Sequence, residues 1–168
     1  MKSSQLHSQI FVYILTLVLV AFIFVFGYSS VRNIKDRAEQ VACLKFENDL
    51  RAAIESISAD FGSVKRKDFQ LCGGYSKVCF VDDSIANRNS PNAVDSKNTP
   101  ISVDPIIKDS ISDRAHKNVF LTENTAKDSF YAGNISVNSD IMCITATNGK
   151  ISLRLEGEGN KASIEQWA

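Results

Sequence analysis

The chain has 168 residues, and its 19 basic and 19 acidic side chains give a formal net charge of zero at pH 7. The longest basic run is Lys65-Arg66-Lys67, which is typical of a solvated patch and gives no reason to expect a nucleic-acid partner. Only two histidines are present, His7 and His116, so the composition argues against a histidine-based catalytic pair or metal cluster.

An unbroken apolar run over residues 10–28 is the strongest feature of the sequence. As a helix with a rise of ~1.5 Å per residue it spans about 28 Å, close to the thickness of the hydrocarbon core of a bilayer. The run is longer than the ~7–15 apolar residues of a cleaved signal peptide. We therefore expect a short leader over residues 1–8, a retained transmembrane helix over residues 9–31, and the lipid bilayer as a partner.

The helix is expected to continue beyond the membrane. After the transmembrane run neither proline nor glycine occurs before Gly62, and Glu47 and Arg51 stand at the i, i+4 spacing that supports a helix. Apolar residues recur close to helical spacing, with charged residues between them. These apolar residues are Ile34, Ala38, Val41, Phe46, Leu50, Ala53, Ile54, Ile57 and Phe61. The pattern predicts an amphipathic continuation over residues 32–62, whose apolar stripe covers the following domain or neighbouring copies of the chain.

Residues 63–168 have the sequence pattern of a β-rich head domain. Lys77–Val81 reads as a strand, and strand-like runs recur at residues 118–121 and 130–137. Residues 82–103 are rich in Asn, Ser, Asp and Pro, which predicts an exposed loop.

A short helix is expected to follow this loop. Asp104 is suited to cap a helix, and Pro105 is suited to its first turn. Ile106, Ile107 and Ile111 then form an apolar side. The pattern predicts two to three turns that end near residues 114–117.

The last predicted element is a β-hairpin. Residues 141–147 and 150–156 flank Asn148-Gly149, a strong signal for a type I′ turn. In that register Cys143 lies opposite Arg154, and one face of the hairpin points to the core. The residues of this inward face are Met142, Ile144, Ala146, Ile151, Leu153 and Leu155.

Four cysteines, Cys43, Cys72, Cys79 and Cys143, follow the transmembrane run. Their spacing lacks the paired arrangement of a zinc site, so we expect no bound metal. Strand alternation turns Cys79 and Cys143 away from the main core. We expect the disulfide Cys79–Cys143, with Cys43 and Cys72 as candidates for a second bridge; the alternative is four buried, reduced thiols.

Signals for the side of the membrane disagree. Arg32, Lys35 and Arg37 follow the apolar run closely, and the positive-inside rule then places the head in the cytoplasm. Disulfides favour an extracytoplasmic head instead. So does the single sequon Asn134-Ile135-Ser136, which makes Asn134 a glycosylation candidate.

A short leader, an apolar stretch that runs directly into an amphipathic helix, and a small β-rich head together resemble the architecture of type IV pilins. Three segments are more closely similar to uncharacterised, pilin-like, single-pass membrane proteins of archaea. They are SQIFVYIL at residues 8–15, GYSKVCFVD at residues 74–82 and NGKISLRLEG at residues 148–157. The resemblance covers most of the chain and implies an α+β fold, in which a long N-terminal helix packs on a small, mainly antiparallel β-sheet head.

The resemblance also implies processing and assembly. Leader cleavage is expected between Ser8 and Gln9, since archaeal pilins are often cut just before a glutamine. This chain departs from the pilin pattern with His7 and Ser8 before the cut and with Tyr13 where many pilins carry glutamate. Assembly with copies of itself or with other pilin-like subunits requires an apolar helix seam; the alternative is that its side chains face lipid. The seam candidates are Phe11, Leu15, Val18, Phe22 and Val25.

No motif of enzymatic chemistry is present. Gly73-Gly74 lacks the Lys-Ser/Thr of a phosphate loop, and neither G-x-S-x-G nor H-E-x-x-H occurs. We expect no enzymatic activity, no cofactor and no small-molecule substrate. The expected function is that of a membrane-anchored, pilin-like structural or surface-interaction subunit with an extracytoplasmic head. The alternative is a non-polymerising, membrane-tethered binding or accessory module, including one that faces the cytoplasm.

Overall fold

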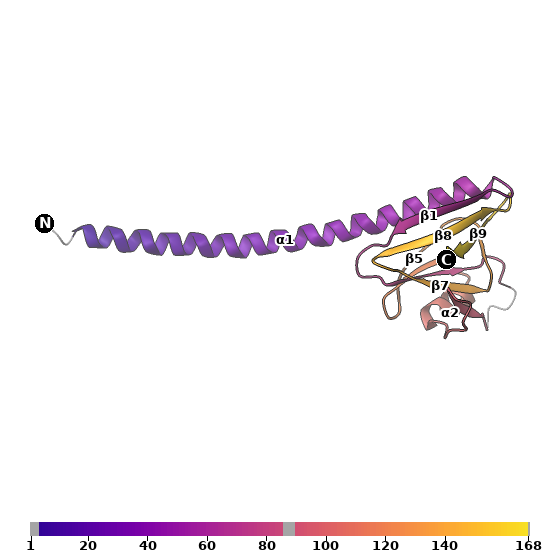
Figure 1. The fold of residues 1–168 in the computed structure, drawn as a ribbon. Coiled ribbons are helices and arrows are strands. Elements are labelled where there is room, and N and C mark those ends of the chain that lie inside the picture. Colours follow the sequence, from indigo (N-terminus) through magenta and orange to yellow (C-terminus); the bar gives the residue numbers. More distant parts are fainter. Residues whose placement is uncertain (1–3, 86–89, 168) are drawn as a thin grey trace. The chain divides into compact units, whose positions relative to one another are not determined.

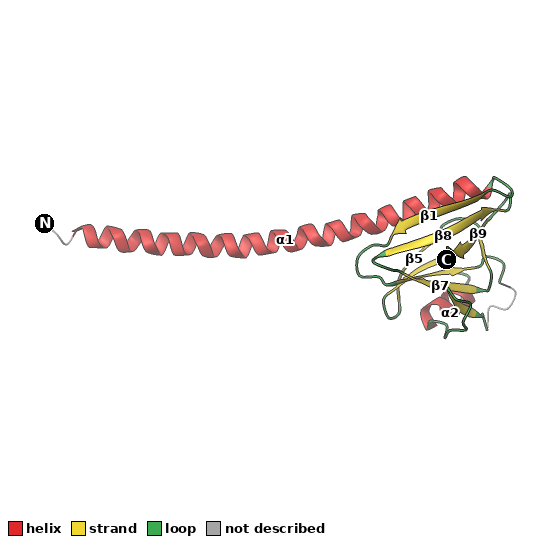
Figure 2. Cartoon of the chain, in the orientation of Figure 1, coloured by secondary structure: helices red, strands yellow, loops and turns green. Residues whose placement is uncertain are grey.

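The computed structural model describes residues 4–85 and 90–167, and the side chains of residues 4–9, 33 and 36 lie outside the described part. The chain divides into two compact units, residues 1–40 and residues 41–168. Figures 1 and 2 show the helices and strands of the described part. In chain order they are α1 (Ser4–Ser58), β1 (Val64–Gln70), β2 (Lys77–Val81), β3 (Ala93–Asp95), α2 (Pro105–Ser112), β4 (Val119–Thr122), β5 (Ala126–Phe130), β6 (Ile135–Val137), β7 (Ile141–Thr145), β8 (Lys150–Gly157) and β9 (Ala162–Gln166).

The long N-terminal helix is confirmed as a single element, α1. In the head unit, a stripe of its apolar side chains is buried. The buried side chains are Phe46, Leu50, Ala53, Ile54 and Ile57. The two ends of the predicted stripe are not buried in the head, since Ile34 and Val41 are each 64% exposed and Phe61 is 84% exposed. Phe61 lies beyond the last turn of α1, where the chain turns toward β1 through Gly62 at a φ of 75°.

The strands form two sheets, whereas a single sheet is predicted, and most of the strand pairs are antiparallel, as predicted. The first sheet has the order β1-β8-β9-β6, and the second has the order β3-β7-β2-β4-β5. Both sheets are mixed, since β6 runs parallel to β9 and β3 runs parallel to β7. The α+β class is confirmed, with α1 packed on these mixed sheets.

The predicted C-terminal hairpin is wrong, although its turn is present. Asn148 and Gly149 have φ angles of 53° and 71°, as a type I′ turn demands. Thr147 and Lys150 exchange backbone hydrogen bonds of 2.9 and 3.0 Å. Beyond this pair the strands separate, because β7 pairs with β2 and β3 while β8 pairs with β1 and β9.

Burial explains the separation of β7 from β8. Four consecutive residues of β7, from Ile141 to Ile144, are buried, so the strand needs cover on both faces and a place inside a sheet. By contrast, β8 alternates between buried and partly exposed residues, which suits a sheet with one solvated face. The predicted inward-facing residues are correct despite the wrong pairing: Met142, Ile144, Ile151, Leu153 and Leu155 are all in the main core, with Ala146 packed against it.

The main core is shared by the stripe of α1 and by one face of each sheet. At its centre the ring of Phe46 meets Phe69 of β1 and Phe130 of β5 edge-on, with ring centroids 6.2 Å apart in both cases. The end of α1 lies so close to β8 that a Cβ at Gly157 would collide with the carbonyl oxygens of Ile57 and Asp60. Glycine at position 157 therefore permits this helix-to-strand approach.

A second core lies on the opposite face of the second sheet, beneath α2. Ile107 and Ile111 of α2 pack there with residues such as Phe120 of β4. The predicted start of α2 is confirmed, since the carboxylate of Asp104 accepts a hydrogen bond of 2.9 Å from the backbone N–H of Ile106. The helix ends at Ser112, before the predicted end, and Arg114 then adopts a φ of 54°.

Two predicted boundaries in the head also need correction. Residues 82–103 are more than an exposed loop, because they contain β3 and the buried side chains of Ile85 and Ala93; residues 86–89 lie outside the described part. The predicted strand over residues 130–137 is interrupted, with β5 ending at Phe130 and β6 starting at Ile135. Gly133, with a φ of 110°, makes the bend between them.

Candidate functional surfaces

The first candidate surface is the apolar part of α1. Within the described residues one helix, Ile10–Ser58, is long and apolar enough to cross a membrane. Its large apolar side chains over residues 10–28 are exposed all round, from Val18 at 43% to Tyr28 at 74%. A helix that is apolar on every side is typical of a membrane span. The predicted seam residues are all exposed on this surface: Phe11, Leu15, Val18, Phe22 and Val25.

The predicted cleavage position lies within the helix. Ser8 and Gln9 belong to α1, and their side chains are outside the described part of the chain. Cleavage between them therefore stays a prediction.

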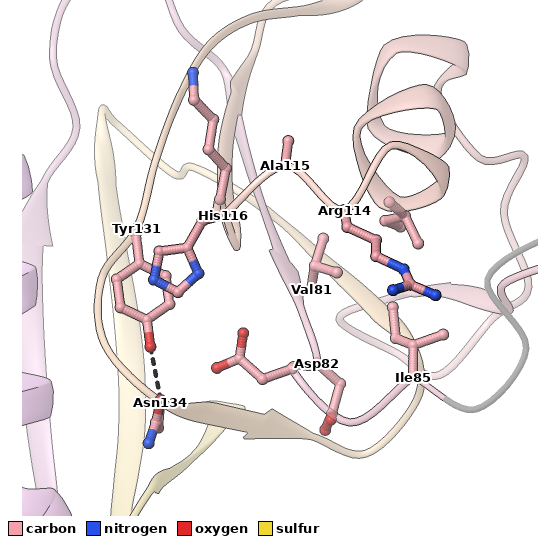
Figure 3. A pocket seen from close by; sticks show the side chains of 11 residues that line it. Val81, Asp82, Ile85, Arg114, Ala115, His116, Tyr131 and Asn134 are labelled. Atoms are coloured by element: carbon pink, nitrogen blue, oxygen red, sulfur yellow. Dashed lines mark hydrogen bonds between the residues drawn. The ribbon is translucent and has the colours of Figure 1, made fainter.

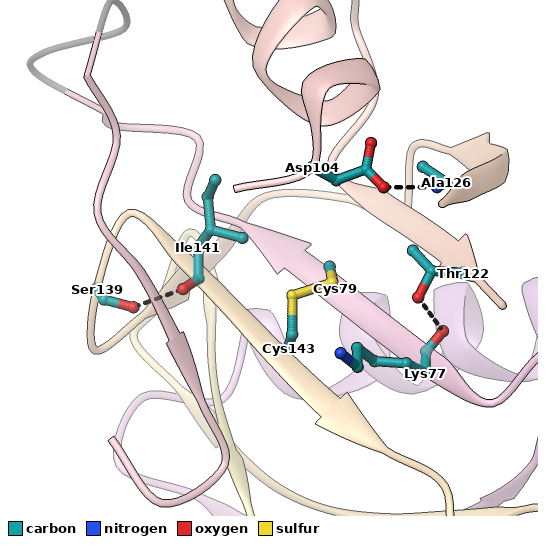
Figure 4. The surroundings of a disulfide bond; sticks show 8 residues. All are labelled: Lys77, Cys79, Asp104, Thr122, Ala126, Ser139, Ile141 and Cys143. Carbon is teal, nitrogen blue, oxygen red and sulfur yellow. Dashed lines mark hydrogen bonds between the residues drawn. A yellow bond between two sulfur atoms is a disulfide. The ribbon is translucent and has the colours of Figure 1, made fainter. Parts of the chain in front are cut away.

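The Cys79–Cys143 disulfide joins two neighbouring inner strands of the second sheet, β2 and β7. The two residues lie directly opposite each other in the register of β2 and β7, with Cα atoms 4.0 Å apart. Figure 4 shows the bridge on the face of the sheet beneath α2, where both cysteines are buried in the second core. This is the pairing that strand alternation predicts, whereas the predicted position of Cys143 opposite Arg154 is wrong.

The second disulfide, Cys43–Cys72, ties α1 to the segment that follows β1. All four cysteines are therefore paired. One bridge fixes α1 to the segment after β1, and the other joins β2 to β7. Disulfides persist in oxidising compartments and are rare in the cytosol, so this arrangement favours an extracytoplasmic head.

A polar junction connects the two sheets at the end of β2. The carboxylates of Asp82 and Asp83 accept hydrogen bonds of 3.0 Å from the backbone N–H groups of Val137 and Ile135, respectively. Both N–H groups lie on the edge of β6 that does not face β9. The sequence suggested only solvated loop aspartates here, because the partner strand is more than fifty residues away in the chain.

Asn118 is the buried centre of this junction, with 1% of its surface exposed. Its amide Nδ2 donates to the carbonyl oxygen of Gly133 at 2.7 Å and to the carboxylate of Asp83 at 3.3 Å, while its Oδ1 accepts from the backbone N–H of Ala132 at 2.9 Å. A single asparagine therefore satisfies the irregular backbone between β5 and β6.

Replacing Asn118 with alanine is expected to lower the free energy of unfolding by about 2–4 kcal/mol. The substitution leaves the Ala132 N–H and the Gly133 carbonyl without partners, and each buried polar group of this kind costs about 1–3 kcal/mol. Urea denaturation of the purified protein measures the change. Asn138→Ala, at an exposed asparagine bonded to Glu165, is the matched control and should cost less than about 1 kcal/mol.

The junction borders a pocket of about 260 Å³. Figure 3 shows His116 stacked on Tyr131, whose hydroxyl donates to Oδ1 of Asn134. The ring centroids of the stack lie 4.0 Å apart, and the hydrogen bond is 2.6 Å long. Asn134 is exposed, whereas Ser136 of the same sequon is buried and donates to Glu158 at 3.1 Å. The glycosylation candidate is therefore accessible at its asparagine only.

Asp83 has a raised pKa. Removal of its carboxylate from water has the largest effect, which the hydrogen bonds from Ile135 and Asn118 partly offset. A raised pKa means that the folded state holds the proton more tightly than the unfolded state does. The contribution of Asp83 to stability is therefore fully present below its ordinary pKa of 3.8 and is lost as the pH rises through the folded-state value.

A comparison with Asp83→Asn tests this sign. The free energy of unfolding of the wild type, minus that of the variant, is expected to fall as the pH rises above the ordinary pKa of 3.8. Urea titrations at a series of pH values measure this difference. A difference that rises over this range would contradict the assigned direction of the shift.

The described residues contain no group of three or more His, Cys, Asp or Glu side chains placed to hold a metal ion. The chain matches no protein-family model, no curated protein and no solved structure. The resemblance to type IV pilins therefore depends on the sequence segments and on the succession of one long helix and a disulfide-bonded head.

Proposed function

We propose that this chain is a membrane-anchored, non-enzymatic, pilin-like subunit whose head lies outside the cytoplasm. The observation that carries the proposal is the difference in exposure between the two halves of α1. Residues 10–28 expose apolar side chains on every side, whereas residues 46–57 bury one stripe in the head core. Such a helix suits a protein that is held in lipid by one end and that carries a folded domain on the other.

The cysteines support the proposed side of the membrane. Arg32, Lys35 and Arg37 favour a cytoplasmic head, but the two disulfides of the head favour an oxidising compartment. We give the disulfides more weight, because the positive-inside rule is a statistical bias, whereas disulfides are rare in cytosolic proteins.

Assembly would use the same apolar surface that holds the subunit in the bilayer. In lipid, helices gain little from further burial of apolar groups, so association depends on close packing of complementary side chains. A filament or membrane oligomer would then exchange lipid contacts for contacts between neighbouring copies of α1. The seam from Phe11 to Val25 is the proposed contact face.

Cross-linking in native membranes between cysteines that are introduced one at a time into the apolar helix tests the proposal. Val18→Cys places a thiol at the centre of the seam, and Val20→Cys places one on the opposite side of the same helix. We expect oxidation to yield covalent dimers of Val18→Cys and to leave Val20→Cys mostly monomeric.

The same experiment separates the proposal from its alternative. The absence of dimers from both variants would favour a non-polymerising, tethered module. Equal dimer yields would indicate random collision and would contradict a specific seam. N-terminal sequencing of the mature protein adds an independent check, since leader cleavage predicts a first residue of Gln9.

A further inference from the structure

The strand β1 lies at the edge of the first sheet, with β8 as its neighbour. Two backbone hydrogen bonds flank its ladder with β8: the N–H of Gly157 donates to the carbonyl oxygen of Ser63 at one end, and the N–H of Leu71 donates to the carbonyl oxygen of Gly149 at the other. In an antiparallel ladder the direction of backbone groups alternates. The N–H and C=O groups of four β1 residues therefore point away from β8. These residues are Val64, Arg66, Asp68 and Gln70.

These outward groups have no partner in the part of the chain that the structure describes. No backbone hydrogen bond between described residues uses them. The strand is seven residues long and six of its residues are exposed. A row of free donors and acceptors of this length is a template for an additional strand.

A groove lies beside this edge, between β1 and the last turns of α1. It has a volume of about 560 Å³. Ala52 and Ser56 of α1 are small and line one side, while Lys65 and Lys67 of β1 line the other. Because the helix side chains are short, the side chains of an incoming strand have room above the sheet.

Charge determines which strand this edge accepts. Lys65 and Lys67 stand on the same face of β1 and form no ion pair with any described residue, whereas Arg66 lies 3.5 Å from the carboxylate of Asp68 and 5.5 Å from the centre of the Trp167 ring. Two copies of β1 would bring their basic residues together and repel each other. The same lysines attract carboxylates spaced at i and i+2 on an extended segment.

We propose that β1 binds an extended, acidic segment of a partner protein as an added strand of the first sheet. Backbone hydrogen bonds to the outward groups of β1 give affinity, and pairing of glutamate or aspartate with Lys65 and Lys67 gives selectivity. This inference depends neither on the side of the membrane nor on assembly through α1, so it stands or falls separately from the proposed function.

Binding of a designed peptide to the full chain in non-ionic detergent tests the selectivity. The probe is a short fluorescein-labelled peptide of alternating valine and glutamate, followed by fluorescence anisotropy. We expect Lys65→Glu/Lys67→Glu to weaken binding at least ~10-fold, because both attractive pairs become repulsive. The matched control Lys97→Glu/Lys108→Glu makes the same change in net charge at exposed lysines elsewhere and should alter binding less than ~2-fold.

A second pair of variants tests the backbone pairing. Arg66→Pro removes an outward N–H without breaking the ladder with β8, and Arg66→Ala removes the same side chain but keeps the N–H. We expect the proline variant to bind at least ~5-fold more weakly than the alanine variant. Hydrogen exchange should show slowed amides at Val64, Arg66, Asp68 and Gln70 in the complex.

The outcomes are decisive in either direction once the melting temperatures of all variants confirm a folded head. Failure of the peptide to bind overturns the proposal, as does an equal loss in the two double-lysine variants. Equal binding by the proline and alanine variants overturns strand addition. Binding to vesicles of anionic lipid without binding to the peptide would assign the basic edge to a membrane surface instead.

Discussion

Replacing both Cys79 and Cys143 with alanine is expected to lower the free energy of unfolding of the head by about 4 kcal/mol. The bridge joins residues 64 positions apart, so its loss releases a long loop in the unfolded chain. Removal of Cys43 and Cys72, which are 29 positions apart, should cost slightly less, about 3.5 kcal/mol. Since a domain of this size has a total stability of ~5–15 kcal/mol, the variant without either bridge should be largely unfolded.

Denaturation of the wild type, the two double variants and the variant without either bridge measures these changes, with near-ultraviolet circular dichroism as the probe. The single variant Cys79→Ala is a useful control, because it breaks the same bridge but leaves a free thiol at Cys143. An unchanged denaturation midpoint in Cys79→Ala/Cys143→Ala would show that this bridge does not contribute to the stability of the native head.

Charges in the apolar half of α1 are expected to abolish membrane anchoring. Val18→Arg/Phe22→Arg places two arginines near the middle of the span, and each costs ~2.5–3.5 kcal/mol on a membrane-insertion scale. The combined cost of ~5–7 kcal/mol should move the protein from the carbonate-resistant membrane pellet to the carbonate-soluble fraction.

Val18→Leu/Phe22→Leu keeps the same positions apolar and should remain in the membrane pellet. Full retention of the arginine variant in the pellet would mean that residues 10–28 are not the anchor. Measurement of both variants by carbonate extraction thus separates an effect of charge from an effect of any substitution in this segment.

Local signals predicted the elements whose causes are local. The start of α2 follows from Asp104 and Pro105, and the turn at residues 148–149 follows from Asn-Gly. The continuation of α1 beyond the apolar run follows from the absence of proline and glycine between Tyr28 and Gly62. In each case a few neighbouring residues determine the backbone conformation.

The pairing of strands was not accessible in the same way. A favourable Asn-Gly turn does not decide which sheet each flanking strand joins. The sequence feature that fits a place for β7 between two neighbouring strands is its run of four apolar residues, from Ile141 to Ile144, all of which are buried. Cys79 and Cys143 gave better information, because their faces constrain which strands can lie side by side.

The polar junction, like the strand pairing, was not predictable from the sequence. Asp82 and Asp83 read as ordinary loop residues and Asn118 as the start of a strand, yet they satisfy backbone groups of β6 and of the bend before it. Their partners lie 14 or more residues away in the chain. No local pattern identifies such an interaction, because it exists only after the two sheets have been brought together.

The most direct test of the account is the accessibility of the head in intact cells. An epitope tag is joined by a flexible linker after Ala168, and protease is added to intact cells without lysis. If the head lies outside the cytoplasm, the tag is lost while a cytoplasmic marker remains intact. Protection of the tag until the cells are lysed would place the head in the cytoplasm and would contradict the proposed extracytoplasmic subunit.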